Sequence, residues 1–274
     1  MALSVLCFGD VVGRPGRQGL AVALKDLRTR HAPCFSVVNA ENAAGGSGIS
    51  VSVSSKLFSS GVDVITTGDH FYRNKEFVTV VDDARVLRPA NFPVAAQGHG
   101  WGVFAGPGGL KIGVINLMGR IFMDPQRCPF EMADEIVPRL REQTPLIVVD
   151  MHAEATSEKI ALGWHLDGRV SVVFGTHTHI QTADERILPG GTAYVTDLGM
   201  TGPYDSVIGR EKAPVLQKLR TGMPARFDVA KGDVRACGAI VRLDADTGKA
   251  LAIERFQIPV NAVSEDCHEA ARPE

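Results

Sequence analysis

The chain has 274 residues, of which 45% are hydrophobic and 22% charged, and its formal net charge at pH 7 is −2. This composition is ordinary for a globular enzyme, and a chain of this length can bury a large core as one α/β domain. The nearly neutral charge balance provides no basic field, which argues against stable, sequence-blind binding to polynucleotides.

The cysteines at positions 7, 34, 128, 237 and 267 are odd in number and include no C-x-x-C pair. That usage is typical of a reduced protein with incidental buried thiols. The N-terminus has no charged lead-in followed by a long apolar segment, and no apolar run approaches the length of a membrane span. We therefore expect a soluble cytoplasmic protein with no membrane partner.

Strand-like and helix-like segments alternate along the chain, which favours a layered α/β fold. In the first third, apolar runs at residues 3–8, 34–38 and 62–67 have the length and β-branched content of buried parallel strands. Helices are expected between and after these runs, over residues 17–30, 54–60 and 75–83.

The remainder of the chain predicts further strands and helices in the same alternation. The expected elements are helices over 131–143 and 156–166, buried strands over 146–149 and 170–174, and antiparallel pairs within 101–116, 186–196 and 238–258. The late antiparallel pair indicates a mixed sheet. We expect one domain over residues 1–260 and a flexible polar tail over 261–274.

Five of the apolar runs are followed directly by residues that can bind a metal. Ligands of open α/β sheets lie outside the carboxyl ends of the strands, so these side chains should meet in one place. They are Asp10, Glu41, Asn42, Asp69, His70, His152, His177 and His179. This many oxygen and imidazole groups suits two transition-metal ions better than one, with manganese, iron or zinc all compatible. The absence of thiolate ligands argues against a structural zinc site.

Each motif alone has a plainer interpretation. His177 and His179 could be one buried, hydrogen-bonded histidine and one exposed histidine. Asp69 could simply cap the segment after a strand. The joint occurrence favours the metal centre, because four of the eight histidines follow apolar runs in this way. The others, at positions 31, 99, 165 and 268, lack that context and are expected to be surface or core residues.

The motifs resemble those of the calcineurin-like metallophosphoesterases, and more closely those of the bacterial branch of YmdB-type phosphodiesterases. The resemblance is carried by residues 9–17, 39–46, 116–120, 152–159 and 175–209 and extends roughly from Leu3 to Pro259. It implies a fold of two facing mixed β-sheets flanked by helices, a four-layer sandwich with the metals at the sheet edges.

The resemblance also implies roles for the predicted site residues. It assigns Asp10, Glu41, Asn42 and His179 to a first ion, Glu41 as the bridging ligand, Asp69, His152 and His177 to a second ion, and His70 as proton donor to the leaving oxygen or electrostatic partner of the phosphoryl group. The implied reaction is hydrolysis of a phosphodiester by a metal-bridging hydroxide, with 2′,3′-cyclic nucleotides as the leading substrates.

Two departures from the family pattern lie beside this site. The usual Gly-Asn-His is Gly68-Asp69-His70 here. An ionised Asp69 should tighten metal binding, reduce the electrophilicity of the metal cluster and move the pH optimum upward. A neutral effect is also open, because a carboxylate and a carboxamide offer the same ligand oxygen. Residues 71–74 read Phe-Tyr-Arg-Asn in place of Thr-Trp-Asp-Lys, so substrate preference is where this chain should differ.

Several assignments stay open at the level of sequence. Arg14, Arg73 and Arg120 are candidate contacts to phosphate or base, and solvation of the surface is the plainer interpretation of each. The rival functions are a metal-binding regulatory protein that binds nucleotide or RNA with little turnover, and a phosphomonoesterase, for which the chain offers no obvious cationic cluster. A homo-oligomer is also open: residues 121–123 could form a dimer contact or a pocket wall, although core packing is the favoured interpretation.

Overall fold

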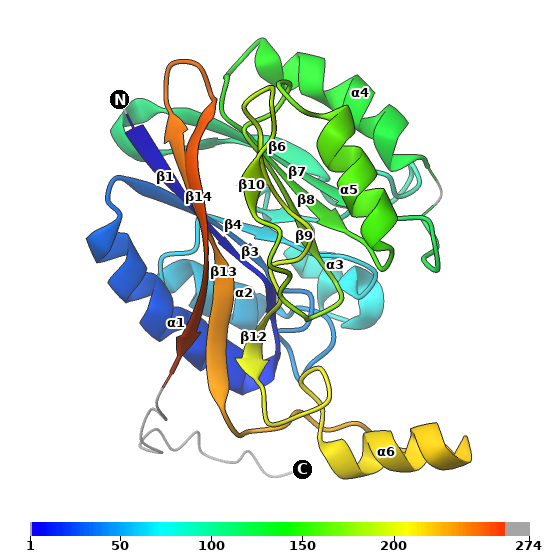
Figure 1. Cartoon of the computed structure of the whole chain (residues 1–274). Coiled ribbons are helices and arrows are strands. Elements are labelled where there is room, and N and C mark those ends of the chain that lie inside the picture. Colours follow the sequence, from blue (N-terminus) through cyan, green and yellow to red (C-terminus); the bar gives the residue numbers. More distant parts are fainter. Residues whose placement is uncertain (1, 126, 261–274) are drawn as a thin grey trace.

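The computed structural model describes residues 2–125 and 127–260, whose strands form two mixed sheets that face each other (Figure 1). The first sheet has the order β2-β12-β13-β1-β3-β4-β5, with β14 paired to β13, and consists of β1 (Ala2–Phe8), β2 (Asp10–Val11), β3 (Cys34–Asn39), β4 (Val64–Thr66), β5 (Val86–Leu87), β12 (Met200–Pro203), β13 (Val234–Asp244) and β14 (Ala250–Pro259). The second has the order β10-β11-β9-β8-β7-β6 and consists of β6 (Trp101–Ala105), β7 (Lys111–Met118), β8 (Ile147–His152), β9 (Val172–Thr176), β10 (Arg186–Ile187) and β11 (Ala193–Val195).

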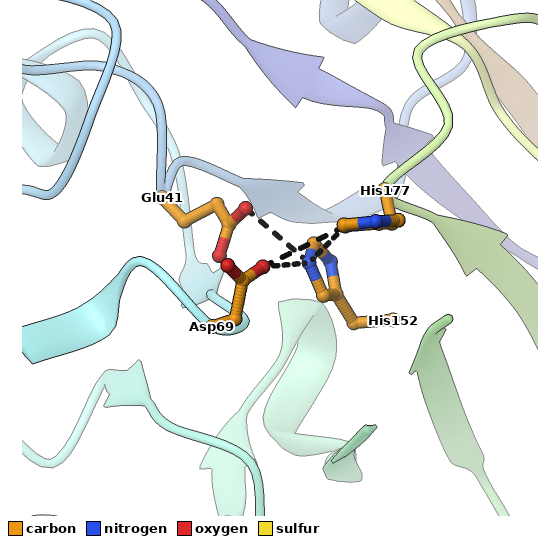
Figure 2. A group of neighbouring side chains, drawn as sticks. All are labelled: Glu41, Asp69, His152 and His177. Atoms are coloured by element: carbon orange, nitrogen blue, oxygen red, sulfur yellow. Dashed lines mark hydrogen bonds and ion pairs between the residues drawn. The ribbon is translucent and has the colours of Figure 1, made fainter. Parts of the chain in front are cut away.

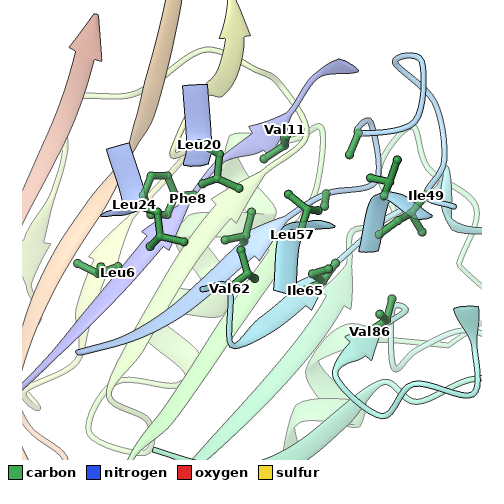
Figure 3. Packing of buried hydrophobic residues seen from close by; sticks show 14 of the residues in the cluster. Leu6, Phe8, Val11, Leu20, Leu24, Ile49, Leu57, Val62, Ile65 and Val86 are labelled. Carbon is green, nitrogen blue, oxygen red and sulfur yellow. The ribbon is translucent and has the colours of Figure 1, made fainter. Parts of the chain in front are cut away.

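Helices cover the outer faces of both sheets. On the first sheet these are α1 (Gly13–Arg30), α2 (Val51–Ser59) and the short α3 (Phe77–Val80), and on the second α4 (Pro129–Arg141) and α5 (Thr156–His165). Helix α6 (Lys212–Thr221) projects away from both sheets (Figure 1), and short 3₁₀ turns lie at Phe71–Arg73 and Pro107–Gly109. Leu20 and Leu24 of α1 pack with Phe8 of β1 in the core outside the first sheet, shown in Figure 3. Helices α4 and α5 bury apolar side chains against β7, β8 and β9 in the same way.

The core between the sheets explains why the strands read as continuous apolar runs. Leu3, Val5 and Cys7 of β1 join the cluster that includes residues of β7, β8 and β9, whereas Leu6 and Phe8 join the cluster under the helices. Because both faces of β1 are buried beyond Ser4, the residues from Val5 to Phe8 are all apolar and show no alternation. The predicted four-layer sandwich with mixed sheets is confirmed. We propose that residues 1–260 form one domain, since the central cluster draws on both sheets; the predicted tail over 261–274 lies outside the described residues.

The helix predicted over residues 75–83 is much shorter than expected. Only Phe77–Val80 is helical, because the Asn74 side chain accepts the N–H of Glu76 at 2.9 Å and fixes a turn that delays the start of the helix. The sequence pattern also did not predict α6 or β12. None of the helices in the described ranges is both long enough and apolar enough to cross a bilayer.

Candidate metal centre

The eight residues predicted for the metal site lie at the carboxyl ends of strands from both sheets. Asp10 follows β1, Glu41 and Asn42 follow β3, Asp69 and His70 follow β4, His152 ends β8, and His177 and His179 follow β9. Strands β1, β3 and β4 are parallel neighbours in one sheet, and β8 and β9 are parallel neighbours in the other. Their carboxyl ends therefore deliver polar side chains to one seam between the sheets.

Four of these side chains form a tight cluster in which each points one ligand atom toward the others, as Figure 2 shows. One atom each of Glu41, Asp69, His152 and His177 lies within 4.8 Å of all the rest. His152 Nε2 lies 3.2 Å from Glu41 Oε1, 3.4 Å from Asp69 Oδ1 and 3.1 Å from His177 Nδ1. Two carboxylates and two imidazoles converging on one point could hold a metal ion.

The charges in this cluster favour a cation. Burial opposes ionisation of Glu41, but the charge of His152 and its hydrogen bond outweigh burial and lower the Glu41 pKa. Burial likewise opposes the charge on Asp69, yet contacts with His152, His70 and His177 hold its pKa far below the usual range. Burial works against the imidazolium of His152, but Glu41, Asp69 and Asp10 raise its pKa well above the ordinary value. A metal cation would compete with that proton for the same nitrogen.

A second group lies beside the first and shares Glu41 with it. The Asn42 amide nitrogen lies 3.4 Å from Glu41 Oε1 and 3.2 Å from His179 Nε2, and His179 Nε2 lies 3.7 Å from Asp10 Oδ1. Asp10 Oδ2 accepts the backbone N–H of His177 at 3.0 Å, but no described residue donates a hydrogen bond to the buried Oδ1. A buried carboxylate oxygen without a donor is costly unless a cation satisfies it, so this residue set fits a metal ion.

His70 borders both groups and is partly exposed. Its Nδ1 lies 2.7 Å from Asn42 Oδ1, and its Nε2 lies 3.4 Å from Asp69 Oδ2. Its backbone N–H donates to Glu41 Oε2 at 3.0 Å. The imidazole is therefore held at the edge of the cluster with access to solvent.

Neighbouring groups orient three of the histidines, two in the cluster and one in the second group. Thr176 Oγ1 donates to the carboxylate of Asp150 at 2.8 Å, so it accepts the Nδ1–H of His152 at 2.9 Å and leaves Nε2 of His152 to face Glu41. The Glu154 carboxylate lies 3.1 Å from His177 Nε2, which leaves Nδ1 of His177 facing the cluster. The remaining imidazole, at position 179, donates Nδ1–H to a backbone carbonyl at position 208 at 3.0 Å, which leaves Nε2 facing Asn42 and Asp10. Such contacts fix the tautomer of a metal-binding histidine.

The turn that carries two of the histidines has an uncommon backbone. His177 and His179 have φ values of 97° and 66°, in the left-handed region that residues with a β-carbon rarely adopt. Asp197 holds the residue between them by accepting the N–H of Thr178 at 3.3 Å and its hydroxyl at 2.8 Å. Asp197 is itself bound to the buried ammonium of Lys159 at 2.6 Å.

Gly68 is required by close approach rather than by its backbone angles. A β-carbon at this position would lie 2.1 Å from the His152 ring and 2.5 Å from Glu41 Oε2. The motif therefore carries glycine because the β4 loop passes directly against the clustered side chains.

A cavity of about 350 Å³ opens beside the cluster. It is lined by Asp69, Arg73, Phe92, Met118, Phe122, Met123, Asp124 and His177. Arg73, whose Nη2 lies 3.4 Å from Asp69 Oδ2, is the predicted substrate contact found in this lining. Arg14 and Arg120 are exposed and do not belong to it. Of residues 121–123, Met123 packs against the core under α4 and α5, as favoured from sequence, whereas Ile121 and Phe122 do not: they are 43% and 90% exposed.

Sequence reasoning missed Asp150, Glu154, Lys159 and Asp197, which hold the histidines or their loop. Asp150 and Glu154 flank His152 in the sequence, and Lys159 ends the segment 152–159 that resembles the family. No spacing rule pairs Lys159 with Asp197, which lies 38 positions further along the chain. The signal available was a charged residue at the end of a strongly apolar strand, as Asp150 is after residues 146–149.

Two facing sheets with a carboxylate–histidine cluster at the strand ends define a hydrolase of the metallophosphoesterase type. The chain belongs to the YmdB-like protein family, whose model matches residues 6–256. A relative from Bacillus subtilis (strain 168), named 2′,3′-cyclic-nucleotide 2′-phosphodiesterase, is 46% identical over 257 residues, covering 93% of this chain and 97% of the relative.

Two solved structures have the same fold over nearly the whole chain. A hypothetical protein from Thermus thermophilus has a TM-score of 0.85 at 38% identity, covering 94% of this chain and 99% of that one. A structure described as a novel phosphatase from Mycoplasma pneumoniae has a TM-score of 0.87 at 33% identity and covers 94% of each chain. The predicted family and enzyme class are confirmed: the protein is a phosphoester hydrolase.

Proposed function

We propose that the protein is a binuclear metal-dependent phosphodiesterase whose substrates are 2′,3′-cyclic nucleotides. The observation that carries the proposal is the convergence of two ligand groups on Glu41, one of which includes the buried Asp10 oxygen without a donor. The name of the Bacillus subtilis relative supports the substrate class. Iron or manganese suits the oxygen and imidazole set best, and zinc is also compatible.

The two groups suggest how the ligands divide. In this assignment Asp10, Glu41, Asn42 and His179 hold one ion, and Glu41, Asp69, His152 and His177 hold the other. When bound, the ions lower the pKa of a water nucleophile and neutralise charge on the phosphoryl oxygens.

Asn42 would have to present its oxygen to the first ion. Its amide nitrogen now faces His179 and Glu41, so the carboxamide would be turned by 180°. Such a turn exchanges Oδ1 and Nδ2, which have nearly the same shape, and the hydrogen-bond partners decide between the two orientations. His70 would then lose the contact between its Nδ1 and the carboxamide oxygen. The protonated imidazole that a general acid requires would be held by the carboxylates of Glu41 and Asp69 instead.

We propose His70 as the general acid that protonates the leaving oxygen. It is the partly exposed histidine that contacts both groups, and a diester leaves a poor alkoxide that benefits from a proton. The alternative is an electrostatic contact with the phosphoryl group.

The charges of the cavity favour a diester over a monoester. Arg73 is its cationic lining residue, and the carboxylates of Asp69 and Asp124 also line the cavity. A phosphomonoester carries more negative charge than a diester at neutral pH and would be disfavoured there. Roles for Arg14 and Arg120, the cytoplasmic location and the oligomeric state stay predictions.

Metal content and turnover test the proposal together. Elemental analysis should give two equivalents of metal per chain, and the manganese-loaded protein should hydrolyse bis-p-nitrophenyl phosphate and 2′,3′-cyclic nucleotides. Asp10→Ala should abolish both activities. Bound metal without turnover of either substrate would favour the regulatory binding protein instead.

A further inference from the structure

The cavity beside the metal cluster has two chemically different sides. Asp69 and His177 belong to the cluster, whereas Phe92, Met118, Phe122 and Met123 form an apolar wall. A ligand with a phosphate at the cluster would therefore extend its other end toward apolar and aromatic side chains. The volume of about 350 Å³ is at the small end of the range for small-molecule sites, which suits a mononucleotide better than an oligonucleotide.

Phe122 is the exposed aromatic residue of this wall. Its side chain is 90% exposed although it is a large apolar group, and its φ of 61° is in the left-handed region. Neither feature is expected of a residue that only contributes to packing, and backbone conformations of this kind cluster at ligand sites.

The loop that carries Phe122 is anchored by buried polar side chains. The Glu158 carboxylate accepts the backbone N–H of Arg120 at 2.9 Å and of Ile121 at 3.0 Å. The N–H of residue 119 donates to the carbonyl of His152 at 2.9 Å, which ties the loop directly to the cluster.

Asn91 joins the two ends of the same loop. Its side chain accepts the N–H of Met118 at 2.9 Å and donates to the carbonyls of Met118 at 2.8 Å and Arg127 at 3.1 Å. Phe122 is therefore presented from a base that is fixed relative to the metal ligands.

We propose that Phe122 stacks on the nucleobase of a substrate whose phosphate lies at the metal cluster, and so determines specificity for nucleoside phosphodiesters. This inference rests on the proposed function and adds to it the part of the substrate that the apolar wall binds. Every base offers an aromatic face on which Phe122 stacks. Purines have the larger stacked area, so Phe122 binds them more strongly than pyrimidines. Asp124 in the same wall accepts hydrogen bonds from an exocyclic amino group and disfavours an occupant with a second phosphate.

The first test compares two cyclic esters that differ only in the base. For the metal-loaded protein, kcat/KM is measured with 2′,3′-cyclic AMP and with ribose 2′,3′-cyclic phosphate. The ratio of kcat/KM for 2′,3′-cyclic AMP to kcat/KM for ribose 2′,3′-cyclic phosphate should fall by about tenfold in Phe122→Ala, the loss typical of one stacked base. The matched control is Leu251→Ala, which removes another exposed apolar side chain. Leu251 lies at the start of β14, beside the end of β13 that pairs with the beginning of β1, whereas Asp10 follows the opposite end of β1. The control substitution should leave the ratio at the wild-type value.

A second test does not depend on turnover. Phe122→Trp should preserve the ratio, and its added fluorescence should be quenched by 2′,3′-cyclic AMP but not by the abasic ester. If the wild-type protein hydrolyses neither ester, the proposed function fails, and the quenching still decides whether Phe122 binds the base. An unchanged ratio with equal quenching by both esters would overturn the inference. An unchanged ratio with a fall in molar mass for Phe122→Ala would overturn it in favour of a contact between copies of the chain.

Discussion

The ammonium of Lys159 and the carboxylate of Asp197 form an ion pair 2.6 Å long whose side chains are each only 1% exposed. Asp197 also accepts both hydrogen bonds of Thr178 and the backbone N–H of Gly199. The pair therefore connects α5 to the turn that carries His177. Its contribution is to hold a backbone that would otherwise relax from the left-handed region.

Lys159→Met should destabilise the fold strongly, because it leaves a buried carboxylate without its partner. We expect the free energy of unfolding in urea to fall by about 3–5 kcal/mol. The matched control is Lys212→Met, which breaks a pair of the same length with the exposed Asp205 and should cost at most about 1 kcal/mol. Similar losses for the two variants would contradict the structural role of the buried pair.

Glu41→Ala should empty both of the proposed metal positions, since both ligand groups meet at this carboxylate. Elemental analysis after gel filtration should find less than half an equivalent of metal per chain. Glu154→Gln serves as the comparison: among the described site residues the Glu154 carboxylate pairs with His177, so the substitution should keep the metal stoichiometry and weaken metal affinity by about 10–100-fold. Retention of one full equivalent by Glu41→Ala would restrict Glu41 to one ion.

His70→Ala should affect substrates according to their leaving groups. An alkyl diester needs a proton on the leaving oxygen, so its kcat should fall by about 10²–10⁴-fold. An aryl ester such as bis-p-nitrophenyl phosphate leaves as a stable anion and should lose much less. If the two substrates lose activity equally, His70 acts as an electrostatic contact and not as an acid.

Asp69→Asn tests the departure from the family motif. The contacts that lower the pKa of Asp69 keep it ionised at neutral pH, so the substitution removes one negative charge beside the cluster. Metal affinity should fall, and the pH optimum of kcat should move downward because a more positive centre acidifies the nucleophilic water. Arg73→Gln, which changes the partner of Asp69 without changing a ligand, is the control for the local charge. An unchanged pH profile in Asp69→Asn would show that this charge does not tune the reaction.

Removal of metal should lower the stability of the whole fold. The proposed ligands come from the carboxyl ends of strands in both sheets, so a bound ion would stabilise the folded state relative to an unfolded chain in which these residues are apart. A free metal ion concentration about 100 times the dissociation constant adds roughly 2.7 kcal/mol to the free energy of unfolding. Thermal unfolding with and without chelator should show the difference in wild type and a much smaller one in Glu41→Ala. An equal shift in both proteins would mean that the chelator acts elsewhere.

The sequence predicted the strand ends well because buried parallel strands carry a strong signal. The runs before Asp10, Glu41 and His152 are apolar on both faces, and the polar residue that follows marks the edge of the sheet. Contacts between distant segments left no such mark, so the pairing of Lys159 with Asp197 was not predicted. Phe122 was misassigned to the core because an apolar triplet reads as packing whether or not the chain turns it outward.

The buried hydrogen bonds around Asp150 have a consequence for how the two sheets are aligned. Apolar contacts between facing sheets are non-directional and do not by themselves select one hydrogen-bonded offset between the layers. Asp150 of β8 accepts hydrogen bonds from Asn39 of β3 at 3.2 Å and Thr66 of β4 at 2.5 Å, and such bonds tolerate little displacement. These hydrogen bonds therefore set the position of one sheet relative to the other. A variant without Asp150 would lose this alignment, so the residues from the two sheets that form the candidate metal centre would no longer meet in register.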